Sequence, residues 1–256
     1  MKKTKQRFRL RFKIIIFLVA YSITFYGYRT SSYYNYRSLI SNIDSIPWLY
    51  STIGLIFGML STFIIQKEWQ QWNDLVDSAK GENSALYEMW LWSKQLKREK
   101  TIEPLIKKYL QTIIAEGWQK TEAGEISHEL DLATEAMYTE VSNIIKDHPH
   151  LASPSHTLMG NIMSNRERRI RFGSSHMPPI LLQTLRFSTA LMVFLCPLIA
   201  VKTLELHYLF SASIAVLSYT IYIVVLDMNQ PLKPGGWHLT TSDYQKLLYK
   251  LEAEKN

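Results

Sequence analysis

Residues 46–65 read IPWLYSTIGLIFGMLSTFII, a run of twenty positions without a charged side chain. An α-helix rises about 1.5 Å per residue, so a run of this length matches the hydrocarbon core of a bilayer, which is roughly 30 Å thick. Soluble proteins seldom bury so long an uncharged stretch. The run therefore predicts a helix that spans a membrane.

Three further apolar segments accompany this one. Residues 14–28 carry no charge, residues 180–201 carry one at Arg186, and residues 206–226 are charged only when His207 is protonated. We therefore predict an all-α integral membrane protein with four transmembrane helices and a cytoplasmic helical bundle inserted between helices 2 and 3. A cleaved signal peptide is the alternative for the first segment, and it would leave the orientation of the other three unchanged.

The distribution of Lys and Arg predicts the orientation of these segments. Basic residues number seven in residues 1–13 and fourteen in residues 66–179, against two in residues 29–45 and one in residues 202–205. Because basic residues favour the cytoplasmic side, both termini and the central region are predicted to lie in the cytoplasm, with the chain in the cell (inner) membrane.

The predicted organisation has five parts. They are a basic cytoplasmic N-terminus at 1–13, transmembrane helices 1 and 2 at 14–65, a cytoplasmic helical domain at 66–179, transmembrane helices 3 and 4 at 180–226, and a cytoplasmic C-terminal tail with a short helix at 227–256.

The net charge of +7 would by itself fit a protein that binds nucleic acid. Residues 1–13 alone carry seven positive charges, however, and they adjoin a predicted membrane helix. We therefore interpret the charge as a topology signal and expect the lipid bilayer, not nucleic acid, as the partner. The single cysteine, Cys196, excludes an intramolecular disulfide and a zinc site built from several cysteines.

The central region shows helical periodicity without strand-like alternation, and its apolar stripes predict helices that pack into a bundle. We expect a turn at Lys80-Gly81, a helix capped at Ser84, a helix capped at Thr101 and a basic helix over residues 158–172. In the tail, Ser242-x-x-Gln245 resembles a capping box for a final helix.

Arg186 is the candidate residue of an ion pathway, because it lies about two helical turns beyond Pro179 and so about 10 Å into the third segment. A charge at that depth is costly unless it faces water, pairs or snorkels. Snorkelling to the interface is the alternative role. Ser211 and Ser218 lie on a mildly polar face of the fourth segment and are further pathway candidates, with helix packing as their alternative.

Two other groups of residues have two candidate roles each. Four small residues share one helical face, which favours close packing between helices and leaves a pore lining as the alternative: Ser51, Gly54, Gly58 and Ser61. Four arginines precede the third segment, where they are candidates for contact with lipid head groups or for a basic entrance that attracts anions: Arg166, Arg168, Arg169 and Arg171.

Signatures of enzymes are nearly absent from the sequence. It contains no Walker loop, no G-x-S-x-G and no H-E-x-x-H motif. Glu125-x-x-His128 matches half of a di-iron carboxylate pattern, which needs a second copy and further Glu ligands. We therefore expect no enzymatic activity, no metal and no cofactor.

Three stretches carry a family resemblance. They are YLQTIIAEGW at 109–118, RERR at 166–169 followed by Pro178-Pro179, and Asp227 followed by Pro231, Gly235 and Trp237. Together they resemble the bestrophin-like family of bacterial multi-pass membrane proteins, a domain family of unknown function, over roughly residues 46–250. The resemblance marks Glu116, Trp118, Asp227, Pro231 and Gly235 as family-motif residues.

The resemblance implies four membrane helices with a cytoplasmic helical domain, and by analogy a homo-oligomeric ion channel for inorganic ions. The basic entrance slightly favours anions. The alternative function is a non-conducting, membrane-anchored scaffold or regulatory protein.

Overall fold

The computed structural model describes residues 2–30, 45–125, 127–198 and 203–254, and these residues form helices joined by turns and loops, without any strand. The predicted all-α fold class is confirmed. Contacts divide the chain into two compact units. The first contains Met1–Trp69, His176–Gln230 and Pro234–Trp237, and the second contains Gln70–Ser175, Pro231–Lys233 and His238–Asn256.

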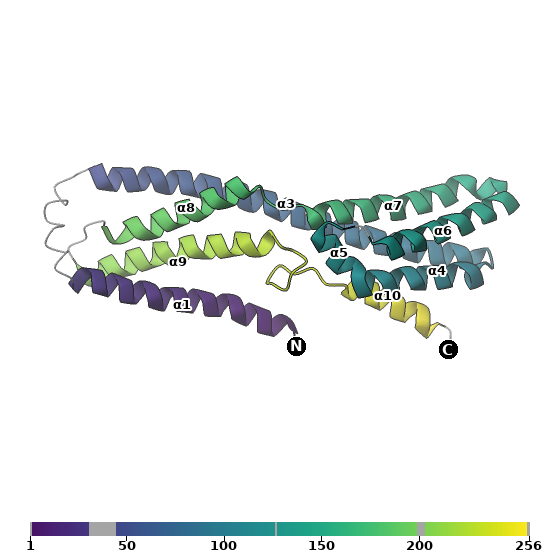
Figure 1. Ribbon diagram of the computed structural model, residues 1–256, viewed down its shortest axis with the longest axis horizontal. Helices are drawn as coiled ribbons and strands as arrows, with labels where there is room; N and C mark the ends of the chain where they lie inside the picture. Colours follow the sequence, from purple (N-terminus) through teal and green to yellow (C-terminus); the bar gives the residue numbers. More distant parts are fainter. Residues whose placement is uncertain (1, 31–44, 126, 199–202, 255–256) are drawn as a thin grey trace. The chain divides into compact units, whose positions relative to one another are not determined.

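Four apolar helices build the first unit (Figure 1). They are α1 (Lys2–Thr30), the beginning of α3 (Ser45–Gln95), α8 (Pro179–Leu195) and α9 (Leu204–Met228). Both α1 and α8 pack against α9. One cluster joins Tyr21 and Phe25 of α1 to small residues of α9, and another joins α3, α8 and α9 around Leu185.

Three of the described helices are long and apolar enough to cross a membrane, namely those over Arg11–Thr30, Trp48–Gln95 and Leu204–Met228. A fourth span is obtained only if α8 is joined to the preceding helix across a bend of 43°. α8 is short because Pro197 has no N–H to continue the helix, and the chain passes into a 3₁₀ turn at Cys196–Leu198. These apolar helices indicate a membrane protein.

Some sequence expectations concern residues that the structure does not describe. Most of the predicted loop at 29–45 lies outside the described residues, as do Lys202 and the last residues of the third apolar segment. The four-span topology therefore stays a prediction.

The second unit is a helical bundle formed by the rest of α3 and five further helices, with two short turns between them. The remaining elements are α4 (Glu99–Thr112), a π-helical turn η1 (Ile113–Gly117), α5 (Trp118–Ala123), α6 (His128–Asp147), a 3₁₀ turn η2 (Pro149–Leu151), α7 (Ala152–Ser174) and α10 (Ser242–Ala253).

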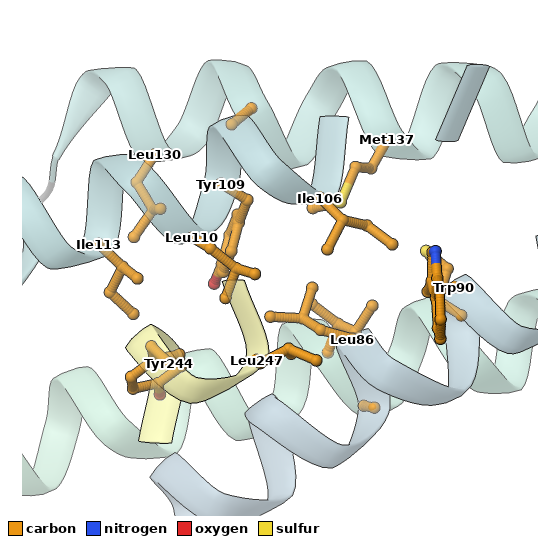
Figure 2. Packing of buried hydrophobic residues seen from close by; sticks show 14 of the residues in the cluster. Leu86, Trp90, Ile106, Tyr109, Leu110, Ile113, Leu130, Met137, Tyr244 and Leu247 are labelled. Carbon is orange, nitrogen blue, oxygen red and sulfur yellow. The ribbon is translucent and has the colours of Figure 1, made fainter. Parts of the chain in front are cut away.

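The core of this bundle lies around α4, which packs against both α6 and α10. Figure 2 shows apolar side chains from four helices meeting there, among them Leu86, Ile106, Met137 and Leu247. These residues are at most 5% exposed. The predicted packing of helices into a bundle is thus present, while its cytoplasmic placement stays a prediction.

The predicted turn at Lys80-Gly81 is wrong, and so is the helix start at Ser84, because α3 continues unbroken from Ser45 to Gln95. Gly81 serves a different purpose. A Cβ at this position would lie 2.6 Å from Oδ1 of Asn165, so glycine permits a close approach of α7 to α3.

Two predicted helix caps are displaced by a few residues. The N-cap of α4 is Arg98, and the hydroxyl of Thr101 donates to the Arg98 carbonyl at 3.0 Å. The N-cap of α10 is Thr241, whose Oγ1 accepts from Nε2 of Gln245 at 3.3 Å. The predicted basic helix at 158–172 is part of the longer α7.

Candidate functional site

The beginning of α3 has one buried face and one exposed face within the first unit. Phe57, Ser61 and Ile64 recur at helical spacing and are buried. The opposite side exposes four apolar side chains, each by about 60%, and we call it the α3 outer face: Leu55, Ile56, Met59 and Phe63.

A shallow, open groove of about 560 Å³ follows the α3 outer face, and all the residues that line it, Thr62 and Gln66 included, belong to α3. Gly58 opens onto this groove, since a Cβ there would meet nothing within 4 Å, and Ser51 is also exposed. Gly54 also lines the groove, and a Cβ there would lie 3.6 Å from Cε of Met192 on α8. The small residues of the sequence therefore lie along the border between the packed side of α3 and the α3 outer face.

The three ion-pathway candidates do not come together in one chain. Arg186 lies on the exposed side of α8 and forms no ion pair with any described residue. Ser211 and Ser218 are each 2% exposed within the packed part of α9. The hydroxyl of Ser211 donates to the Tyr208 carbonyl at 3.2 Å, which fits a packing role.

The four arginines before the third apolar segment separate into two pairs on α7. Arg168 and Arg171 are exposed. Arg166 is largely buried and forms an ion pair with Asp131. Arg169 is fully buried, so it does not belong to a basic surface. The reason is helical geometry, because positions 166 and 169 face the bundle while 168 and 171 face away.

Arg169 is part of the most extensive buried polar cluster among the described residues, which we call the Glu82 network. Its five members are Glu82, Tyr109, Thr121, Arg169 and Tyr244. Nε of Arg169 donates to Oε2 of Glu82 at 2.6 Å, and Nη1 donates to Oγ1 of Thr121 at 2.9 Å. The side chains of Glu82 and Arg169 are both 0% exposed.

Two tyrosines complete the hydrogen bonding of Glu82. Tyr109 donates to Oε1, and Tyr244 donates to Oε2 at 2.9 Å. Burial and the charge of Glu82 raise the pKa of both hydroxyls well above the ordinary value of 10.0. Burial opposes the charge of Arg169, yet the attraction of Glu82 prevails and raises its pKa. The network thus contains one buried positive charge, on Arg169, and one buried negative charge, on Glu82, and the two are paired with each other.

The raised tyrosine pKa values predict alkaline instability. Above pH 10 an unfolded tyrosine releases its proton while the folded one retains it, so each buried tyrosine lowers the free energy of unfolding by about 1.4 kcal/mol per pH unit. Below pH 10 its contribution is fully present. We expect Tyr244→Phe to flatten this decline in urea unfolding between pH 8 and 11. Tyr249→Phe, at an exposed position of α10, is the control, and an equal slope in both variants would contradict the assignment.

A family model described as a Bestrophin-like domain matches residues 38–233 of this sequence. The chain belongs to the Bestrophin-like family. Two solved variants of a bacterial bestrophin homologue from Klebsiella pneumoniae share its fold, both with a TM-score of 0.74. One is 9% identical and covers 96% of this chain and 98% of its own, and the other is 10% identical and covers 95% and 99%.

A further solved structure, of a membrane protein, is 12% identical with a TM-score of 0.69 and covers 96% of this chain and 98% of its own. A search of curated proteins found no match. At these identities the solved structures show the fold of this Bestrophin-like chain and not its activity. The described residues contain no group of three or more His, Cys, Asp or Glu that could hold a metal ion.

Trp118 and Glu116 of the Bestrophin-like motif have different surroundings. The ring of Trp118 packs edge-to-face on Tyr244 at 5.8 Å and lies 5.8 Å from the Arg169 guanidinium, while its Nε1 donates to the Leu239 carbonyl at 3.0 Å. Glu116 is partly exposed, and hydrogen bonds from Ser127 and Lys120 lower its pKa. Trp118 therefore borders the Glu82 network, whereas Glu116 fastens the end of the π-helical turn.

The Asp227 motif of the Bestrophin-like chain forms a tight turn after α9. Oδ2 of Asp227 accepts from the backbone N–H groups of Gly236 at 2.6 Å and of Trp237 at 3.0 Å. A Cβ on Gly235 would lie 2.0 Å from Oδ1 of Asp227, so only glycine fits there. Pro231 belongs to the second unit, where its carbonyl accepts from the N–H of Leu239 at 2.8 Å.

Sequence reasoning missed Glu82, Thr121 and Tyr244. Glu82 followed a glycine that was interpreted as a turn, and the other two carry no motif of their own. One signal was available on α7, where the buried positions Met159, Ile162, Arg169 and Gly173 follow helical spacing. An arginine on an apolar helical face requires a buried acid as its partner.

Proposed function

We propose that this Bestrophin-like protein is an ion channel formed by several copies of the chain in the cell (inner) membrane. The observation that supports this is the α3 outer face, where apolar side chains about 60% exposed border a groove that contains Thr62 and Gln66. Within the predicted span, Thr62 and the open position at Gly58 suit a contact with another helix or a water-filled path better than contact with lipid alone, and Gln66 follows directly after the span. Copies arranged around this face would give it either a subunit contact or an aqueous pore.

The proposal keeps the predicted topology of four spans with both termini in the cytoplasm. Its support is the excess of Lys and Arg in residues 1–13 and 66–179 over the intervening loops. The boundaries at 13, 65, 179 and 226 remain those of the sequence prediction. The expected partners are the bilayer, further copies of the chain and inorganic ions.

The proposed preference for anions now depends on Arg168 and Arg171, because Asp131 and Glu82 neutralise the other two arginines. Exposed arginines at a pore entrance would raise the local concentration of anions. Arg186 remains the pathway candidate within the first unit, since its charge on an exposed helix surface would be stabilised by water or by a partner from another copy, with snorkelling to the interface as the alternative. We assign Ser211 and Ser218 to helix packing.

Substitutions of opposite charge on the α3 outer face test the proposal. In liposomes containing the purified protein, we expect Met59→Lys to shift the anion-to-cation permeability ratio upward and Met59→Glu to shift it downward. The two variants should differ about tenfold, equivalent to about 1.4 kcal/mol, because a charge ring in a pore acts directly on the permeating ion. Reversal potentials in asymmetric salt measure this ratio.

The same pair of substitutions at Met163, an exposed position on α7, is the matched control. A shift of equal size from Met163 would show that the α3 outer face does not line the pathway. If the unmodified protein gave no ion flux and was a monomer in detergent, the channel proposal would be wrong. Crosslinking in cells that captured a second protein would then favour the scaffold.

A further inference from the structure

A second open surface lies between α3 and α10 in the second unit. It is a pocket of about 410 Å³, which we call the lysine pocket. Lys80 comes from α3, while Lys246 and Lys250 come from α10, and Asp243 is the only acid on the wall. Three ammonium groups against one carboxylate make the pocket positive.

The positive groups of the lysine pocket are held in different ways. Nζ of Lys250 donates to the hydroxyl of Tyr87 at 2.7 Å and lies 4.0 Å from the centre of that ring. Nζ of Lys246 pairs with Asp243 at 2.8 Å. Lys80 is exposed and forms no ion pair with a described residue. The ammonium group of Lys250 is therefore held by Tyr87, that of Lys246 is paired with Asp243, and that of Lys80 is available to a ligand.

Neutral donors lie beside these charges on the same face of α3. Asn83 and Ser84 follow Lys80 by three and four residues, so all three side chains share one helical face. The buried Oδ1 of Asn83 has no hydrogen-bond partner among the described residues. The amide group of Asn83 carries two N–H donors beside this oxygen. The wall thus presents ammonium, amide and hydroxyl donors together.

We propose that the lysine pocket binds a small phosphate-bearing anion between α3 and α10. A phosphate group offers several strong acceptor oxygens and a charge near −2, which matches converging lysines and neutral donors. Cations are excluded by the ammonium groups. The ligand would connect Lys80 of one helix with the lysines of the other and would thereby fasten α10, which carries Tyr244 into the Glu82 network.

Calorimetric titration of the full-length protein in detergent with inorganic pyrophosphate tests this proposal at constant ionic strength. We expect saturable binding that Lys80→Gln weakens about tenfold, because a charged hydrogen bond is lost. Asp243→Asn should instead strengthen binding, since it removes the acid from the wall and frees Lys246. Lys146→Gln, at an exposed position on α6, is the matched control and should bind as the unmodified protein does.

A second readout follows from the position of the pocket between two helices. Saturating pyrophosphate should raise the thermal unfolding temperature of the unmodified protein but not that of Lys80→Gln. The proposal fails if pyrophosphate gives no saturable heat at millimolar concentration, or if Lys80→Gln and Lys146→Gln bind it equally. Neither measurement depends on ion conduction, so a failed channel proposal leaves this test intact.

Discussion

Glu82→Gln and Arg169→Met are each expected to destabilise the protein by about 3–5 kcal/mol, the usual cost of leaving one buried charge without its partner. Both side chains are 0% exposed, so water cannot replace the missing group. In Glu82→Gln the guanidinium loses its carboxylate. In Arg169→Met the carboxylate keeps only the donors of Tyr109 and Tyr244.

Urea unfolding followed by tryptophan fluorescence in detergent measures this loss. The double variant Glu82→Gln/Arg169→Met should recover a large part of it, because no unpaired charge remains in the core. Arg98→Gln is the control, since it breaks an ion pair with Asp147 whose side chains are 39% and 56% exposed. That change should cost less than about 1 kcal/mol. Single variants of the buried pair that matched this control would refute the assignment.

Gly235→Ala has the second large expected effect, a loss of about 3 kcal/mol. The added Cβ would overlap Oδ1 of Asp227 at 2.0 Å and Cγ at 2.8 Å, so the turn must move away from the carboxylate. The N–H groups of Gly236 and Trp237 then lose their acceptor. Hydrogen bonds to a charged group contribute about 1.5–3 kcal/mol each.

Gly160→Ala gives a control of opposite sign for this prediction. Gly160 lies within α7, and a Cβ there meets nothing within 4 Å. Alanine inside an exposed helix is favoured over glycine by up to about 1 kcal/mol, so this variant should be slightly more stable. The thermal unfolding temperatures of Gly235→Ala and Gly160→Ala test this prediction. Similar temperatures would contradict the inference that the turn at Asp227 requires glycine at position 235.

The sequence was sufficient for the apolar helices and for the helical character of the bundle, because both follow from local composition and periodicity. It failed at Gly81, which was interpreted as a break in the helix. Glycine has two uses that look alike in a sequence, a turn and a close approach between helices. Only the position of Asn165 against α3 distinguishes them.

The Glu82 network could not be predicted for a related reason. Glu82 and Arg169 are 87 positions apart, and no local pattern connects an acid on one helix with a base on another. Arg169 also stands within a run of basic residues, which favoured a surface role. The helical periodicity of α7 places Arg169 on the buried face and Arg168 on the exposed one. That periodicity identifies Arg169 as buried, but it does not identify Glu82 as its partner.

The order of the Glu82 network along the chain has a consequence for biosynthesis. Glu82 is translated early, whereas Tyr244 belongs to α10, the final helix of the described chain. Both α8 and α9 are made between them. A bundle that began to assemble on the nascent chain would therefore lack one donor to its buried carboxylate until α8 and α9 had left the ribosome. The hydrogen bonding in the core of the bundle can therefore be completed only after α8 and α9 have been synthesised.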